Sequence, residues 1–249
     1  MIPAGVDLSI LGPAFVTGLV VLATHVPLGE RVLARGIVFL DLAIAQLAAA
    51  GAIAGHLLLP DVGVVSGLAP FAAALAGSYA LYRSERRWPA LQEAIIGVVF
   101  VVTASALLLM LAKSPHGGEQ LNDVLAGQIL WVAWEDVGSA AAVSGLVLAV
   151  WLWRMRRGGV PQSLFYVLFA VSVTVSVQLV GVYLVFASLI LPALAARGLG
   201  LTAGFAVGTA GYAAGLLASG LWDLPAGPAV VVALAATAGA ASALPRVSG

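Results

Sequence analysis

Nine long apolar runs fill most of the chain and leave little sequence between them. A run of about 20 apolar residues is long enough to cross the hydrocarbon core of a bilayer as a helix. The composition agrees, because 62% of the 249 residues are hydrophobic and 9% are charged, against about 25% charged in soluble domains. We therefore expect an all-α integral membrane protein, a bundle of 8–9 membrane elements forming a single domain over residues 1–249. The runs lie near 8–28, 37–59, 63–82, 94–112, 137–153, 164–180, 181–196, 199–221 and 226–244.

The few charged residues and the lack of cysteine exclude several functions. The 11 basic and 11 acidic residues give a formal net charge of zero, which predicts no nucleic-acid partner. Without cysteine the chain has no disulfide, no thiolate metal site and no cysteine nucleophile. It also contains no nucleophile elbow, phosphate-binding glycine loop or dinucleotide fingerprint. These absences disfavour an intramembrane enzyme, and we expect no covalently bound cofactor.

The basic residues predict the topology, because short cytoplasmic loops of membrane proteins are enriched in Lys and Arg. If the N-terminus is outside and each run crosses once, all ten arginines fall on the cytoplasmic side and Lys113 falls outside. The opposite orientation places ten of the eleven basic residues outside. We therefore expect an external N-terminus and a cytoplasmic C-terminus. The arginines are Arg31, Arg35, Arg83, Arg86, Arg87, Arg154, Arg156, Arg157, Arg197 and Arg246.

The stretch from Gln178 to Gly198 is apolar, with Gly181 near its start, and Pro192 interrupts it. A proline inside a helix frees the carbonyl four residues earlier, and free polar backbone is tolerated at membrane depth only against protein or a water-filled path. The topology also requires an even number of crossings between Arg157 and Arg197, which is little chain for two full spans. We therefore expect a discontinuous or re-entrant element near 181–196 that borders a transport pathway.

Two further segments have a predicted structure. Gly51 and Gly55 are four residues apart, and the four glycines of 204–215 follow one another at spacings of four, three and four. This spacing predicts close packing between helices in the membrane. Residues 120–134 predict an interfacial or partly inserted helix, with Trp131 and Trp134 at headgroup depth.

Ionisable and amide side chains inside the runs are the candidate functional residues. Asp41 lies about one turn into the second run, Gln46 deeper, and His56 near its outer end. Asp41 and Gln46 are about 140° apart around a helix, so they do not form an adjacent ligand pair. Asp41 is either a pathway ligand or an internal partner of Arg35 or of another helix. His56 is either a ligand or a local hydrogen-bonding group near the membrane surface, and the second reading is favoured.

Other polar groups are weaker candidates. Gln46, Gln128 and Gln178 can line a polar path without the cost of a charge, or can hydrogen-bond between helices. Ser188 lies in the interrupted stretch and is a neighbour of the expected path.

Four blocks in the same order resemble the signatures of the membrane subunit of bacterial ABC importers for zinc and manganese. The resemblance covers nearly the whole chain. The blocks are Pro27-Leu28-Gly29 with Arg35, Asp41, Ala45-Gln46 and Gly51; Leu125-Ala126-Gly127-Gln128 with Glu135-Asp136; Val180-Gly181 with Ser188-Leu189-Ile190-Leu191-Pro192-Ala193; and Asp223-Leu224-Pro225-Ala226-Gly227-Pro228.

The resemblance implies a permease in the bacterial inner membrane that transports a divalent ion, zinc first and manganese second. It implies a homodimer, or a heterodimer of two such permeases, with a pathway on the two-fold axis. It also implies two cytoplasmic ABC ATPase subunits, which hydrolyse ATP, and an extracytoplasmic binding protein that delivers the metal. The permease itself is then not an enzyme. Asp41 and Gln46 are expected to line the path, with Gln128, Ser188 and His56 as further candidates.

The chain departs from the family pattern at two places. The family has an Asp and, four residues on, a His where this chain has Leu42 and Gln46, and an Asp where it has Gln128. Zinc and manganese prefer imidazole and carboxylate ligands, so these changes predict weaker capture or a different ion. The family also has an ATPase-docking stretch in the loop that here runs directly from Arg154 to Ser163. Another loop near Arg83–Trp88 then contacts the ATPase, or the chain is a facilitator or accessory subunit that works without one.

Overall fold

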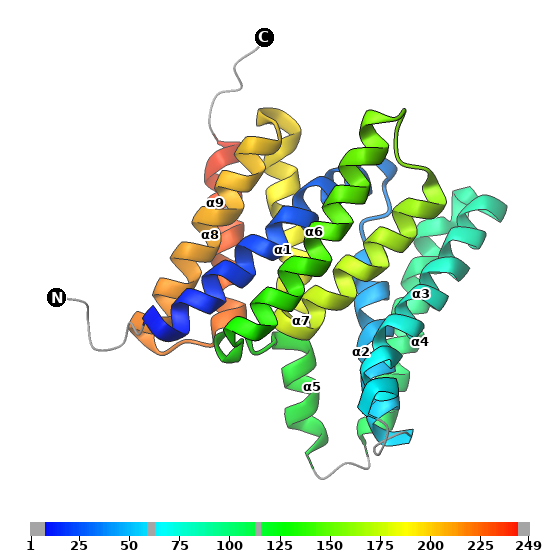
Figure 1. Ribbon diagram of the computed structural model, residues 1–249, viewed down its shortest axis with the longest axis horizontal. Helices are drawn as coiled ribbons and strands as arrows, with labels where there is room; N and C mark the ends of the chain where they lie inside the picture. The colour runs from blue at the N-terminus through cyan, green and yellow to red at the C-terminus, as the bar shows by residue number, and fades with distance from the viewer. Residues whose placement is uncertain (1–7, 59–62, 113–115, 244–249) are drawn as a thin grey trace.

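The structure, a computed structural model, describes residues 8–58, 63–112 and 116–243, and these are helical almost throughout (Figure 1). The all-α membrane fold expected from the sequence is confirmed, and six helical stretches are long and apolar enough to cross a membrane. The helices are α1 (Leu8–Arg35), α2 (Leu40–Leu58), α3 (Gly63–Arg87), α4 (Gln92–Leu111), α5 (Gly117–Ala126), α6 (Trp134–Arg156), α7 (Gln162–Leu199), α8 (Leu201–Trp222) and α9 (Ala226–Ser242), with short 3₁₀ turns η1 (Pro89–Leu91) and η2 (Ile129–Trp131).

Helix α7 is two antiparallel arms joined at Gly181, whose φ of 79° and ψ of 165° are not helical. In Figure 1 the yellow-green first arm of α7 descends, and the yellow second arm rises again. Contacts agree with this reversal. Tyr166 in the first arm bonds Glu85, which lies beside Arg35 of α1, and Ala193 in the second arm packs against Gly29 of the same helix. The discontinuous element expected near 181–196 is therefore present.

The break is at Gly181 and not at Pro192, so the expectation that the proline interrupts the helix is wrong. Pro192 lies inside the second arm of α7, where Gly181 is the residue with non-helical backbone angles. Pro13, Pro27 and Pro70 also lie inside helices. Prolines are tolerated in membrane helices where neighbouring helices and side chains compensate the lost hydrogen bond.

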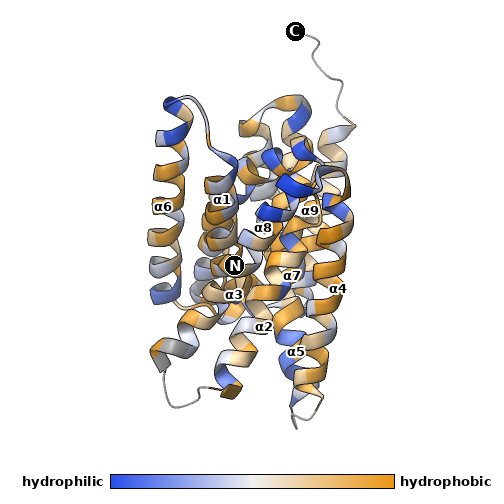
Figure 2. Ribbon diagram, turned by 90° about the vertical axis from the view of Figure 1, so that its right-hand side faces the viewer, coloured by the Kyte–Doolittle hydropathy of each residue, from blue (hydrophilic) through white to orange (hydrophobic). Residues whose placement is uncertain are grey.

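The ends of α1, α3 and α6 lie together and form the arginine-rich end of the molecule. Arg31 donates a hydrogen bond from Nη2 to the carbonyl oxygen of Val160 at 2.9 Å, and Arg35 Nη1 lies 4.0 Å from Glu85 Oε2. Figure 2 shows hydrophilic segments at this upper end and also at the lower ends of some helices, including α5 and α6, with mostly apolar ribbon between them. The basic residues described there thus share one end, as the topology argument requires.

Glycines bring the helices into close contact, as the sequence predicted. A Cβ atom placed on Gly51 would lie 2.7 Å from the carbonyl oxygen of Ala69 in α3, and one on Gly215 would meet the backbone of Val230 in α9. Gly204, Gly208 and Gly211 are similarly closed in by α7, α1 and α9. Backbone approach of this kind supplies contact where lipid provides no hydrophobic drive between helices.

The segment expected as one helix over 120–134 is interrupted. Helix α5 ends at Ala126 because Gly127 adopts a φ of 72°, and Trp134 begins α6 instead. Trp131 and Trp134 are both exposed. The prediction of a single helix here is wrong because Gly127 is required at a close backbone contact with α7, which the sequence alone does not show.

Candidate functional site

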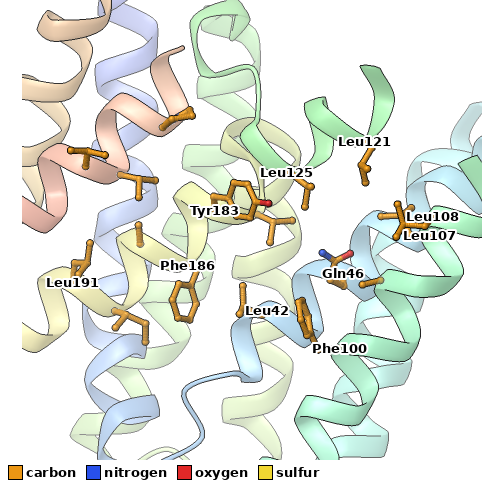
Figure 3. Close-up of a pocket in the computed structure, with 17 residues that line it drawn as sticks. Leu42, Gln46, Phe100, Leu107, Leu108, Leu121, Leu125, Tyr183, Phe186 and Leu191 are labelled. Carbon is orange, nitrogen blue, oxygen red and sulfur yellow. The ribbon is translucent and has the colours of Figure 1, made fainter. Parts of the chain in front are cut away.

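A cavity of about 800 Å³ lies between α2, α4, α5, the second arm of α7 and α9. Figure 3 shows side chains from these helices converging on it, with Leu42 and Gln46 on one wall and Tyr183, Phe186 and Leu191 on another. The volume is in the range of about 300–1,000 Å³ that is usual for small-molecule sites. Gly181 positions this cavity, because the reversal of the chain there aims the second arm of α7 along it.

Gln46 supplies one of two polar groups on the described wall of the cavity, and the phenol of Tyr183 is the other. The Gln46 side chain is 3% exposed, and its Oε1 has no hydrogen-bond partner among the described residues. Leu42 is one helical turn before Gln46 and faces the same cavity. Gln46 and Leu42 thus both line this cavity.

Asp41 is fully buried and does not line the cavity. Neither carboxylate oxygen has a hydrogen-bond partner among the described residues. The alternative of an Arg35 partner is wrong, since Arg35 lies against Glu85 and over the ring of Phe165. Asp41 and Gln46 therefore point to different sides of α2, as their angular separation predicts.

Ser188 is buried behind the wall of the cavity, in the second arm of α7. Its Oγ donates to the carbonyl oxygen of Leu184 at 2.6 Å and lies 2.7 Å from the hydroxyl of Tyr212 in α8. This bond links α7 to α8. Ser188 is adjacent to Ala187 on the cavity wall, but its own hydroxyl is engaged within the protein.

Gln128 and His56 lie away from the cavity. Gln128 is exposed and lines a groove of about 520 Å³ together with Gln178 and Asp136. His56 is exposed near the end of α2. The five candidate residues therefore do not form one cluster, and no group of three His, Cys, Asp or Glu residues converges anywhere in the described ranges.

Sequence reasoning missed a junction of three backbones next to the cavity. A Cβ atom on Gly127 would meet the carbonyl group of Val180, one on Gly181 would meet the amide of Gly127, and one on Gly227 would meet the carbonyl oxygen of Ala126. The junction holds the end of α5, the turn of α7 and the start of α9 together. The sequence could have indicated that a helix ends at Gly127, because glycine often follows the last residue of a helix. It could not have indicated the contact with Val180 and Gly181, which lie more than fifty residues further along the chain.

The loop between α6 and α7 is short in the structure as in the sequence. Helix α6 ends at Arg156 and α7 begins at Gln162, and Gly158 and Gly159 adopt φ values of 104° and 105°. The loop is held at Val160 by Arg31. It contains no helix.

A bundle of long apolar helices, one of them reversed beside a half-open apolar pocket, defines a multi-pass membrane protein. The chain belongs to the ABC 3 transport family, whose family model matches residues 7–157 and 160–244. The match is interrupted at Gly158 and Gly159, within the short α6–α7 loop. The chain is thus the membrane-spanning component of an ABC transporter.

A solved structure supports the fold. The chain is similar to a chain of "PsaBC from Streptococcus pneumoniae in complex with Fab", with a TM-score of 0.73 over 93% of this chain and 90% of that chain. The sequence identity is 20%, so this likeness concerns the fold alone.

Proposed function

We propose that the chain is the permease subunit of an ABC importer for a divalent transition-metal ion, zinc first and manganese second, in a bacterial inner membrane. It forms one domain over residues 1–249 and works as a homodimer with a cytoplasmic ABC ATPase and an extracytoplasmic metal-binding protein. ATP is hydrolysed by the partner subunits, and the permease alternates between states open to either side. The N-terminus is external and the C-terminus cytoplasmic.

The observation that carries this proposal is the reversal of α7 at Gly181 beside the cavity that contains Gln46. Interrupted helices beside a cavity are the usual way in which transporters place polar groups at membrane depth. The family match supports the importer class, and the arginine-rich end supports the orientation by the positive-inside rule.

The candidate residues have different roles in this proposal. Gln46 contacts the cargo in the cavity, and a neutral amide lets an ion leave more easily than a carboxylate does. Gln128 and His56 are exposed and act at the outer entrance. Asp41 and Ser188 are buried behind the cavity walls and act in a second conformation, in which α2 or α7 has turned.

Asp41 gives a direct test in cells. We expect Asp41→Ala to reduce metal-dependent growth under chelation more than His25→Ala does. His25 is the matched control because it is also fully buried, and its Nδ1 lies 2.9 Å from the carbonyl oxygen of Val21 in its own helix. Both variants are compared at equal membrane abundance, measured by immunoblot. Growth of both variants equal to wild type would remove Asp41 from the mechanism.

The short α6–α7 loop favours a second candidate, a permease-fold facilitator or accessory subunit without an ATPase. The end of α3 and the α3–α4 turn remain as an exposed contact surface, with Arg86, Arg87, Trp88 and Leu91 all exposed. Co-purification separates the two functions. Stoichiometric recovery of an ATPase that is lost on Trp88→Ala supports the importer with a displaced contact, and recovery of the permease alone supports the facilitator.

A further inference from the structure

A basic pocket of about 560 Å³ lies along α3 at the arginine-rich end of the molecule. Its lining is formed by Ala80, Arg83, Ser84, Arg86, Arg87 and Trp88. Residues three, four and seven positions after Ala80 lie on the same face of a helix as Ala80 itself, and these are Arg83, Ser84 and Arg87. From Ala80 to Arg87 this face extends about 10 Å along the helix axis. The pocket therefore lies on the side of α3 and not only at its end.

No carboxylate lines this pocket to balance its arginines. Glu85 lies between them in sequence but points into the bundle, where its Oε2 accepts a hydrogen bond from the hydroxyl of Tyr166 at 2.6 Å. Arg83 and Arg87 are exposed and form no ion pair with any described residue. A guanidinium presents a planar set of N–H donors that matches the oxygens of a phosphate group. The pocket is thus suited to an anion of the phosphate type.

The surroundings of the pocket favour a lipid over a free phosphate ion. Trp88 is 53% exposed, and its ring centre lies 6.0 Å from the guanidinium carbon of Arg87. Tryptophan is enriched at headgroup depth, and arginine is enriched on the cytoplasmic side. Ala72 and Ala76 precede Ala80 on the same face of α3 and are exposed like it, and Figure 1 shows α3 at the edge of the bundle. A ligand in the pocket therefore meets arginines at one end and an apolar helix face at the other.

We propose that this pocket binds the phosphate headgroup of an anionic phospholipid from the surrounding bilayer. Arg83 and Arg87 contact the phosphate, and an acyl chain lies along the face of α3 that carries the alanines. Basic pockets on the cytoplasmic side of membrane proteins are suited to such headgroups. Arg86 contributes less, because its Nη1 donates a hydrogen bond to the hydroxyl of Tyr82 at 3.2 Å. The site requires only that the chain lies in a membrane, so it does not depend on the proposed transport function.

Native mass spectrometry of the purified full-length chain in detergent tests this proposal. The chain is titrated with phosphatidylglycerol, with phosphatidylcholine of the same acyl chains, and with sodium phosphate, and the dissociation constant of the first bound molecule is measured. Each basic residue near an anionic headgroup contributes about fivefold to the affinity, so phosphatidylglycerol should bind at least about tenfold more tightly than phosphatidylcholine. Equal affinities for the two lipids would overturn the proposal, as would sodium phosphate that displaces phosphatidylglycerol. This comparison uses the wild-type chain, so it does not depend on the folding of any variant.

Two charge-matched double variants locate the lipid. Arg83→Gln with Arg87→Gln should weaken the first phosphatidylglycerol at least about tenfold and remove the preference over phosphatidylcholine. Arg156→Gln with Arg157→Gln is the control, because it also removes two exposed arginines at this end of the molecule, and neither lines the pocket. The control should keep the preference, and unchanged elution volumes show that both proteins are folded.

Two outcomes of the variants would overturn the proposal. An equal loss in both double variants would show a general attraction of the lipid to the positive end of the molecule and no site on α3. A variant at Arg83 and Arg87 that keeps the lipid preference but loses a co-purifying ATPase would assign these arginines to the cytoplasmic partner.

Discussion

Replacing Gly181 with alanine probes the turn on which the cavity depends. At φ 79° and ψ 165° the residue occupies a backbone region that is essentially restricted to glycine. The added Cβ would also meet the backbone of the α5–η2 segment, lying 2.6 Å from Gly127 Cα and 2.8 Å from the carbonyl carbon of Ala126. Because these atoms are backbone, they cannot rotate away as a flexible side chain would.

Both effects destabilise the folded state. The backbone conformation costs an alanine about 1–3 kcal/mol, and overpacking of a closed contact costs about 1–3 kcal/mol more. The expected loss is therefore about 2–6 kcal/mol if the two costs add. For a chain of this size each kcal/mol lowers the melting temperature by about 2–4 °C, so we expect a decrease of at least about 4 °C.

Intrinsic tryptophan fluorescence during heating in detergent measures this decrease, since the chain contains six tryptophans. Gly145→Ala in α6 is the matched control, because Gly145 is exposed and a Cβ there has no atom within 4 Å. Alanine is favoured over glycine in a helix by about 1 kcal/mol, so the control should keep or slightly raise the melting temperature. A Gly181→Ala protein that melts with wild type would refute the tight junction at this turn.

Two further predictions concern buried polar groups. Ser188→Ala should destabilise the protein by about 1–3 kcal/mol, because it leaves the buried Tyr212 hydroxyl without its partner. Tyr212→Phe should destabilise it by about 1 kcal/mol, since Ser188 keeps its hydrogen bond to Leu184. Equal melting temperatures for the two variants would contradict this order. Asp41→Leu should raise stability by about 1–3 kcal/mol, because it removes a buried carboxylate without a described partner. A lower melting temperature for Asp41→Leu would show that Asp41 stabilises this conformation.

The reversal of α7 could be predicted because charge distribution constrains the whole chain. Arginines at 157 and 197 must lie on one side of the membrane, so the segment between them must return. The position of the break could not be predicted in the same way. Proline is a strong helix breaker in water, yet four prolines lie inside helices here. The left-handed backbone at Gly181 follows from a contact with Gly127, which depends on how distant elements pack.

The sequence could predict which polar residue belongs to the site, but it could not predict which apolar residues line the cavity. Gln46 stood out as a polar side chain in an apolar run, and the structure places it in a cavity. The separation of Asp41 from Gln46 followed from helical geometry alone. The apolar lining could not be anticipated, since Phe100 and Phe186 come from α4 and α7 and are ordinary residues of membrane helices until the fold brings them beside Gln46.

The walls of the cavity are held together at two places. Its α5, α7 and α9 walls are joined at the backbone junction of Gly127, Gly181 and Gly227, and its α2 and α4 walls are joined by the bond from the Phe39 amide to Glu93, next to the start of each helix. Packed interfaces tend to shift between discrete arrangements and do not deform continuously. Strain introduced at Gly181 acts on the α5, α7 and α9 walls together, because their backbones meet at this junction.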